Sequence, residues 1–168
     1  MFGHCGKKLL FMGQDFGQER EWSEARELDW FMLAEKCNKG LHDYVKELLT
    51  LYRKYPALYE FDNSWEGFEW MNADDADNSV YSFVRKDSTG RNRLLFVLNM
   101  TPMTRESYRV AVPGKGTYKL LLNSAEEKFG GLGGEIPAQL MAEKKECHYK
   151  EYSICFDLPP YAAAVFVF

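Results

Sequence analysis

A short charged stretch, GKKLLFMGQDFGQEREW at residues 6–22, has the residue types of a carbohydrate site. Its polar and aromatic members are Gln14, Asp15, Gln18, Glu19, Arg20, Glu21 and Trp22, and further acids follow at Glu24, Glu27 and Asp29. Amide, carboxylate and guanidinium groups bracket sugar hydroxyls, and an indole stacks on the face of a sugar ring. Glycoside chemistry needs two carboxylates that flank the scissile bond. The stretch therefore has enough acids to hold a catalytic pair.

The same acids also fit a simpler interpretation. In a solvated loop they would pair with Arg20 and Arg26 and take no part in chemistry. A Ser-His-Asp triad does not compete with either interpretation, because His4, His42 and His148 lie in unrelated parts of the sequence. The residues alone leave both the catalytic pair and the solvated loop open.

The cysteines and glycines do not indicate a metal or a cofactor. Cys5, Cys37, Cys147 and Cys155 form no C-x-x-C pair, and their spacing fits no zinc module. If residues 147–158 form a strand, Cys147 and the adjacent His148 point to opposite faces and make a poor metal pair. FGGLGGE at 129–135 lacks the G-x-G-x-x-G register and a following helix. We expect reduced thiols in a cytoplasmic protein, no metal and no cofactor.

Composition narrows the class of partner. A net charge of −4 over 168 residues, without a basic cluster, excludes the electrostatic footprint of a nucleic-acid-binding protein. No stretch approaches the roughly 20 apolar residues of a membrane span, and the first residues do not form a signal peptide. Aromatic residues make up 15% of the chain, which favours a densely packed β core.

The elements around the charged stretch form one βα unit. Continuous hydrophobicity in KLLFMG predicts a buried strand at residues 8–13, and the unpatterned residues 14–37 predict a long loop. A helix is expected at 38–55, with Asn38 as its N-cap and Pro56 as its stop. Its apolar stripe consists of Leu41, Val45, Leu48, Tyr52 and Tyr55. A lone βα unit cannot close a core, because its strand needs neighbours on both edges.

The rest of the chain follows a β pattern. Turn residues separate strands expected at 67–72, 79–86, 93–100, 107–112, 117–122, 147–158 and 162–168. Such spacing is typical of an antiparallel sandwich. LLFVL at 94–98 and AAAVFVF at 162–168 are apolar on both faces. We therefore expect one face of each to fill the sandwich and the other to pack on the helix.

Two features of the first β region have alternative interpretations. Asn72 to Asn78 is read as a hairpin loop whose side chains bond local amides, because it lacks the Gly and distal Glu of a calcium loop. Trp70 fits either a core residue, which we expect, or a platform for a sugar ring. Trp65 is the better candidate for an exposed aromatic that stacks on a sugar ring.

Several motifs together resemble the C-terminal end of bacterial glycogen branching enzymes, within the α-amylase superfamily. The opening stretch is followed in order by RELDW, LYRKYPALYEFD, EGFEWMNADDADNSVYSFVRK, LNMTPMTRESYRVAVP and LPPYAAAVF. The resemblance covers nearly the whole chain and is weakest at 123–147. Asp15 departs from the glutamate that the family leads us to expect at that position.

The resemblance implies a mainly β fold: an α-amylase-type C-terminal antiparallel β-sandwich preceded by the last βα unit of a (β/α)8 barrel. Residues 1–61 would be the remnant of the catalytic barrel, and residues 62–168 the sandwich domain. Barrel catalytic residues lie at the C-terminal ends of the strands. The family's catalytic Asp, Glu and Asp come from earlier strands, so no catalytic residue is assigned here.

The resemblance also implies a function. The parent enzyme would transfer an α-1,4-glucan segment to form an α-1,6 branch of glycogen, and this chain alone would be inert and support the barrel. The alternative is an α-glucan-binding sandwich module of another superfamily enzyme. Substrate contacts are expected at Gln14, Asp15, Gln18, Arg20, Glu21, Trp22 and Trp65. The expected partners are α-glucan, the missing barrel and, through its exposed edges, a second copy, unless residues 1–37 are disordered.

Overall fold

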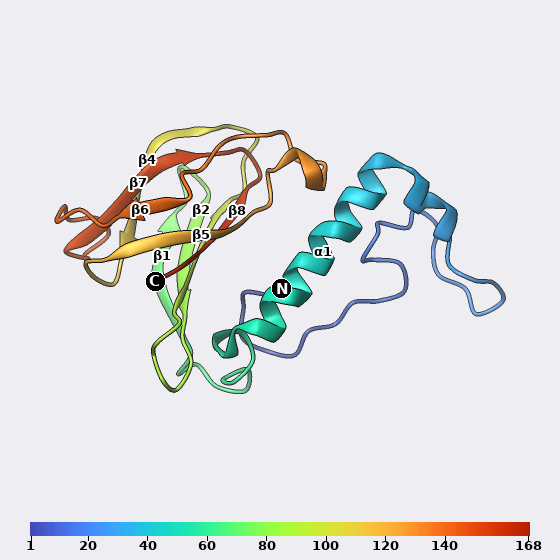
Figure 1. The fold of residues 1–168 in the computed structure, drawn as a ribbon, viewed down its shortest axis with the longest axis horizontal. Coiled ribbons are helices and arrows are strands. Elements are labelled where there is room, and N and C mark those ends of the chain that lie inside the picture. Colours follow the sequence, from blue (N-terminus) through green and yellow to red (C-terminus); the bar gives the residue numbers. More distant parts are fainter.

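Eight strands, one long helix and three short 3-10 helices form the fold, and the computed structural model describes every residue from 1 to 168 (Figure 1). The helices are η1 (Trp30–Ala34), α1 (Lys36–Lys54), η2 (Pro56–Leu58) and η3 (Glu127–Phe129). The strands are β1 (Phe68–Asp75), β2 (Val80–Arg85), β3 (Leu94–Asn99), β4 (Arg105–Val112), β5 (Thr117–Asn123), β6 (Gln139–Met141), β7 (Tyr152–Leu158) and β8 (Ala163–Val167). The chain is therefore mainly β, as the sequence predicts.

Two antiparallel sheets face one another. The larger sheet has the order β1-β2-β3-β8-β5-β6, and β4 pairs with β7 in the smaller one. β8 is the last strand in the chain, yet it lies in the middle of the larger sheet, between β3 and β5. The alternating residues Ile154, Phe156 and Leu158 of β7 are buried in the core between the sheets. Residues 152–158 of the strand expected at 147–158 therefore form β7, with one face in the core, although Ser153 on the other face is also buried.

The larger sheet has an apolar core on each of its faces. Leu95 and Val97 of β3 join the cluster between the sheets, whereas Leu94 and Phe96 join a second cluster with Leu51 of α1. The residues of β8 divide in the same way between the two clusters. Figure 1 shows α1 beside the strands, with the loop that precedes it on the far side of the helix. The prediction that these strands pack on the helix is confirmed.

The expected buried strand at residues 8–13 is wrong. These residues form no strand, and Leu9 is 72% exposed. Phe11 and Met12 are also exposed. The physical reason is that this segment has no strand beside it to supply ladder hydrogen bonds, so a buried extended conformation would leave its amides unpaired.

The start of α1 also differs from the prediction. The helix begins at Lys36 after Glu35, which makes no side-chain capping bond. Asn38 lies inside the first turns, where its side chain bonds the loop that precedes the helix. Gly40 lies inside α1, where glycine is otherwise unfavourable, because there is no room for a side chain. A Cβ at this position would come 2.7 Å from the carbonyl carbon of Phe129. The glycine-rich loop at 129–135 therefore packs against α1.

Two β elements were placed imperfectly from the sequence. Residues 147–150 form a tight turn instead of the first part of a strand, because His148 and Tyr149 both have positive φ. Strand β6, which pairs with β5, was not predicted. Its three residues are too short to show a pattern.

A buried ionic cluster fastens the first eight residues to the sheet. Asp62 lies 3.2 Å from Nζ of Lys8 and 3.5 Å from a guanidinium nitrogen of Arg85, and its other oxygen accepts from the hydroxyl of Tyr52 at 2.9 Å. Arg85 is fully buried and also donates to the carbonyls of Gly67 and Gly3. The two cations share one carboxylate inside the protein. This arrangement joins the segment before the charged loop, the end of α1 and β2.

Candidate functional site

The charged loop at 14–30 is held mainly by contacts within the loop and with α1. Gln14 accepts from the amide of Phe11 at 2.9 Å through its side-chain oxygen. Oδ2 of Asp15 lies 3.2 Å from Nδ1 of His42, one turn beyond Asn38 on α1. The side chain of Gln14 is therefore hydrogen-bonded within its own loop, and that of Asp15 lies beside α1.

Gln18 and Arg20 meet at Asp29. The side-chain oxygen of Gln18 accepts from the amide of Asp29 at 2.8 Å, and its nitrogen donates to the carbonyl of Arg20 at 3.0 Å. Nε of Arg20 donates to Asp29 at 2.7 Å, and a second guanidinium nitrogen bonds the other carboxylate oxygen. The hydrogen bond from Arg20 lowers the pKa of Asp29 below its ordinary value and raises the pKa of Arg20. Asp29 is therefore an ionised anchor for the loop.

Glu21 and Trp22 are the freer members of the loop. The carbonyl of Glu21 accepts from Arg26 at 3.1 Å, while its side chain is exposed. The exposed ring of Trp22 packs edge-on against Phe11 with centroids 5.5 Å apart. These two residues have the exposed polar and aromatic surface that a sugar contact requires.

Trp65 lies apart from the loop. It is 67% exposed, and its ring contacts are edge-on with His4 and Phe68. With His4, Asp62 and their neighbours it borders a hollow of about 220 Å³. Trp70, which was expected in the core, is 45% exposed and packs edge-on against Phe68 and Phe83.

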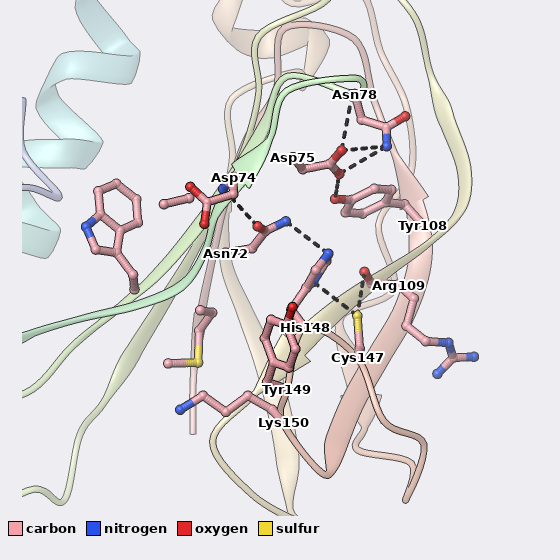
Figure 2. Close-up of a pocket in the computed structure, with 13 residues that line it drawn as sticks. Asn72, Asp74, Asp75, Asn78, Tyr108, Arg109, Cys147, His148, Tyr149 and Lys150 are labelled. Carbon is pink, nitrogen blue, oxygen red and sulfur yellow. Dashed lines mark hydrogen bonds between the residues drawn. The ribbon is translucent and has the colours of Figure 1, made fainter.

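A larger hollow of about 960 Å³ lies between β1, β4 and the turn at 147–150 (Figure 2). Asp75 sits at its inner side, where it accepts from the hydroxyl of Tyr108 and from the side-chain nitrogen of Asn78 at 2.8 Å. Asn72 contacts His148 at 3.2 Å, and the other ring nitrogen of His148 lies 3.2 Å from the sulfur of Cys147. Figure 2 shows these groups pointing toward one another across the hollow.

The polar groups that line this hollow form hydrogen bonds mainly with one another. Burial raises the pKa of Asp75, but hydrogen bonds from Tyr108 and Asn78 outweigh it, so its pKa is lowered. Burial, reinforced by Asp75, raises the pKa of Tyr108 well above its ordinary value. Burial also raises the pKa of the Cys147 thiol. Asp75 is thus an ionised acceptor of several hydrogen bonds and Cys147 a protonated thiol, so neither side chain is prepared to act as a general base or a nucleophile.

The local hydrogen bonds predicted for Asn72–Asn78 are present, but the predicted extent of the loop is wrong, because residues 72–75 belong to β1. Asn72 accepts from the amide of Asp74 at 3.1 Å, and Asp75 accepts from the amide of Asn78 at 3.2 Å. The sequence did not reveal that Cys147 and His148 complete a hollow with this loop. Their apolar–polar alternation resembled a strand, and only consecutive left-handed residues, rare outside glycine and asparagine, bring them together. The structure contains no cluster of three His, Cys, Asp or Glu side chains that could hold a metal ion.

Comparisons with known proteins give consistent matches. A family model described as the alpha amylase C-terminal all-beta domain matches residues 70–168. A 1,4-alpha-glucan branching enzyme from Butyrivibrio fibrisolvens is 64% identical over 168 residues, which is 100% of this chain and 26% of that protein. One from Rubrobacter xylanophilus is 44% identical over 162 residues, or 96% and 22% of the two chains.

The chain thus spans about a quarter of the length of these curated relatives. A solved structure of an inactive double mutant of MutB superposes with a TM-score of 0.52 at 14% identity, covering 93% of this chain and 23% of the other. At that identity, the likeness concerns the fold alone. None of the helices combines the length and the hydropathy that crossing a membrane requires.

Proposed function

Because the chain belongs to the family of the α-amylase C-terminal all-β domain, we propose that it serves as the C-terminal part of a glycogen branching enzyme. The reaction is the transfer of an α-1,4-glucan segment to a glucan hydroxyl, which forms an α-1,6 branch. The observation that carries this proposal is the 64% identity to a branching enzyme over all 168 residues. Catalysis is assigned to segments outside this chain, in the cytoplasm of the cell, where the four free cysteines stay reduced.

The role of this chain within that enzyme is structural. Residues 1–61 are assigned to the catalytic barrel and residues 62–168 to the sandwich. Support comes from the shared cluster in which Leu51 of α1 and Tyr55, the residue after the helix, pack with Leu94 and Phe96 of β3. A helix buried against a sheet in this way moves with the sheet as one body. The sandwich therefore braces the last helix of the barrel.

The charged loop is proposed to border the glucan. Gln14, Asp15, Gln18, Arg20, Glu21 and Trp22 contact sugar hydroxyls and ring faces in this proposal, and Trp65 offers a separate stacking surface. Supporting it, Glu21 and Trp22 are exposed, whereas Gln14 and Gln18 each retain unused amide donors or acceptors beyond the bonds described above. The same internal bonds support the competing view that the loop residues only brace one another.

The remaining barrel is proposed to cover the exposed apolar residues around this loop. Leu9, Phe11, Met12, Trp30 and Phe31 are each at least 49% exposed. Such a group of large apolar side chains is typical of a surface that packs against another body. In the isolated 168-residue chain, self-association is proposed to take place through the same residues.

A replacement experiment tests the proposed function. The matching quarter of the Butyrivibrio fibrisolvens enzyme is exchanged for this chain, and branch formation is followed by the change in iodine staining of amylose. We expect the chimera to keep branching activity and the isolated chain to have none.

Two results would contradict the proposal. A chimera that is folded and monodisperse but inactive would show that the chain does not substitute for the enzyme's own C-terminal part. Branch formation by the isolated chain would show that catalysis resides within it. A chimera carrying Trp22→Ala, with Glu47→Ala as an exposed control, then measures whether the loop contributes to the KM for amylose.

A further inference from the structure

Two side chains on one face of α1 hold the middle of the charged loop. Nδ2 of Asn38 donates to the carbonyl of Phe16 at 2.8 Å and to the carbonyl of Gly17 at 3.2 Å. One turn later, Nδ1 of His42 lies 3.2 Å from a carboxylate oxygen of Asp15. Residues four apart on a helix share a face, so Asn38 and His42 contact three consecutive loop residues, 15–17, from the same side.

The loop backbone needs an external support at this point. Gly17 has a φ of +68°, in the left-handed region, and Phe16 is fully buried against Trp30 with ring centroids 5.1 Å apart. The carbonyls of residues 16 and 17 take both amide hydrogens of Asn38. Without that donor pair, two part-buried carbonyls would have no side-chain partner, and the turn at Gly17 would be free to change direction.

Asp15 and His42 have a different relation. Nδ1 of His42 is buried and has no partner at hydrogen-bonding angles, so Asp15 is its polar neighbour. Side chains of both residues are about one-third exposed. The carboxylate of Asp15 thus lies beside His42 without a formed hydrogen bond, whereas Asn38 holds the main chain of the loop by two hydrogen bonds.

We propose that Asn38 and His42 are positioning residues that aim the glucan-contacting side chains of the loop. This inference rests on the proposed role of the loop as one border of the glucan site. Asn38 sets the backbone that carries Gln14, Asp15 and Gln18, and His42 sets the direction of the Asp15 carboxylate. Neither residue contacts the glucan itself.

Hydrogen–deuterium exchange on the full 168-residue chain tests the first half. In Asn38→Ala we expect amides of residues 14–18 to exchange about tenfold faster, since two hydrogen bonds to the loop are lost. The strands should exchange as in the wild type. Asn38→Gln keeps an amide donor and should recover part of the protection, whereas Asn38→Asp, which cannot donate, should not. Glu47→Ala, on an exposed part of α1, is the matched control.

Affinity electrophoresis in a glycogen gel tests the second half. We expect Asn38→Ala and His42→Ala to weaken retardation several-fold, with His42→Ala leaving amide exchange at residues 16–18 near the wild-type rate. His42→Lys places a cation opposite Asp15 and should recover retardation. A brace without a positioning role would not give this separation between the two residues.

The outcomes separate this inference from the function on which it rests. Faster exchange in Asn38→Ala with unchanged retardation would overturn the positioning role and leave a loop brace. Unchanged exchange would overturn the role of Asn38 altogether. A wild-type chain that migrates freely through glycogen would overturn the proposed loop–glucan contact, and the positioning role with it, while exchange would still report whether Asn38 holds the loop.

Discussion

Replacement of Asp62 by alanine should destabilise the whole chain, because it leaves two cations buried without their shared anion. Arg85 is fully buried, and the side chain of Lys8 is 9% exposed. Each lies within 3.5 Å of one Asp62 oxygen, and the hydroxyl of Tyr52 bonds the other. Arg85 already donates only to the carbonyls of Gly67 and Gly3, so the replacement removes the carboxylate that pairs with its charge and leaves its hydrogen bonds unchanged.

The expected magnitude follows from this burial. Removing one partner of a buried ion pair typically lowers the free energy of unfolding by about 3–5 kcal/mol, because the remaining charge is left desolvated. With an m-value of about 2 kcal/mol per molar urea, that loss moves the unfolding midpoint down by about 2 M. A chain whose total stability is about 5–15 kcal/mol loses a large fraction of it.

Urea unfolding followed by far-UV circular dichroism measures the effect, with Asp77→Ala as the control because Asp77 is exposed in the hairpin loop. The triple variant Lys8→Met, Asp62→Ala, Arg85→Met should regain part of the loss, since it removes the uncompensated cations together with the anion. A midpoint for Asp62→Ala within about 0.3 M of the wild type would refute the assignment of this cluster as a buried clamp.

Three further perturbations have definite expected outcomes. Gly40→Ala should lower the melting temperature despite the higher helix propensity of alanine, because the new methyl group would lie 2.7 Å from the carbonyl carbon of Phe129. Overpacking of this kind costs about 1–3 kcal/mol. An unchanged melting temperature in a thermal scan would contradict the contact. Tyr149→Gly should raise the melting temperature, because Tyr149 is fully exposed at a φ of +64°. At that φ a side chain costs about 1 kcal/mol, whereas glycine fits without strain. A lower melting temperature would show that the tyrosine ring stabilises the turn. Asp75 has a lowered pKa in the folded state, so its stabilising contribution is present above about pH 4 and is lost as the pH falls through the folded-state pKa. Urea unfolding at pH 7 and pH 3 should therefore show a smaller acid-induced loss in Asp75→Asn than in the wild type, and equal losses would contradict the role of Asp75 as an ionised acceptor.

The β half of the fold was largely predictable from local pattern. Continuous hydrophobicity in residues 94–98 and 162–168 indicates that both faces of these strands are buried. The two-sided burial even indicated the helix as the second partner, which the shared cluster of Leu51 and Leu94 confirms. These inferences succeed because successive side chains of a strand point to opposite faces, so the order of apolar residues shows which faces are buried.

The predictions that failed depend on neighbours that local pattern does not contain. The apolar run at 8–13 resembles a strand, but a strand also requires hydrogen-bonding partners beside it. Asn38 is a good capping residue by type, yet its donors bond carbonyls more than twenty positions earlier. The hollow of Figure 2 depends on left-handed backbone at His148 and Tyr149, which residue type disfavours. Residue identity indicated the charged loop, whereas the conformation of the loop depends on its contacts with α1.

The position of β8 has a consequence for how the chain acquires its structure during synthesis. During synthesis α1 and all the other strands precede β8, which completes the surface under the helix. Until β8 emerges, β3 and β5 have an unfilled gap between them, and both apolar clusters lack their β8 residues. Folding of this region therefore waits for β8, with apolar strand edges open to other nascent chains in the interval. Loss of residues 163–167 would remove an inner strand of the sheet.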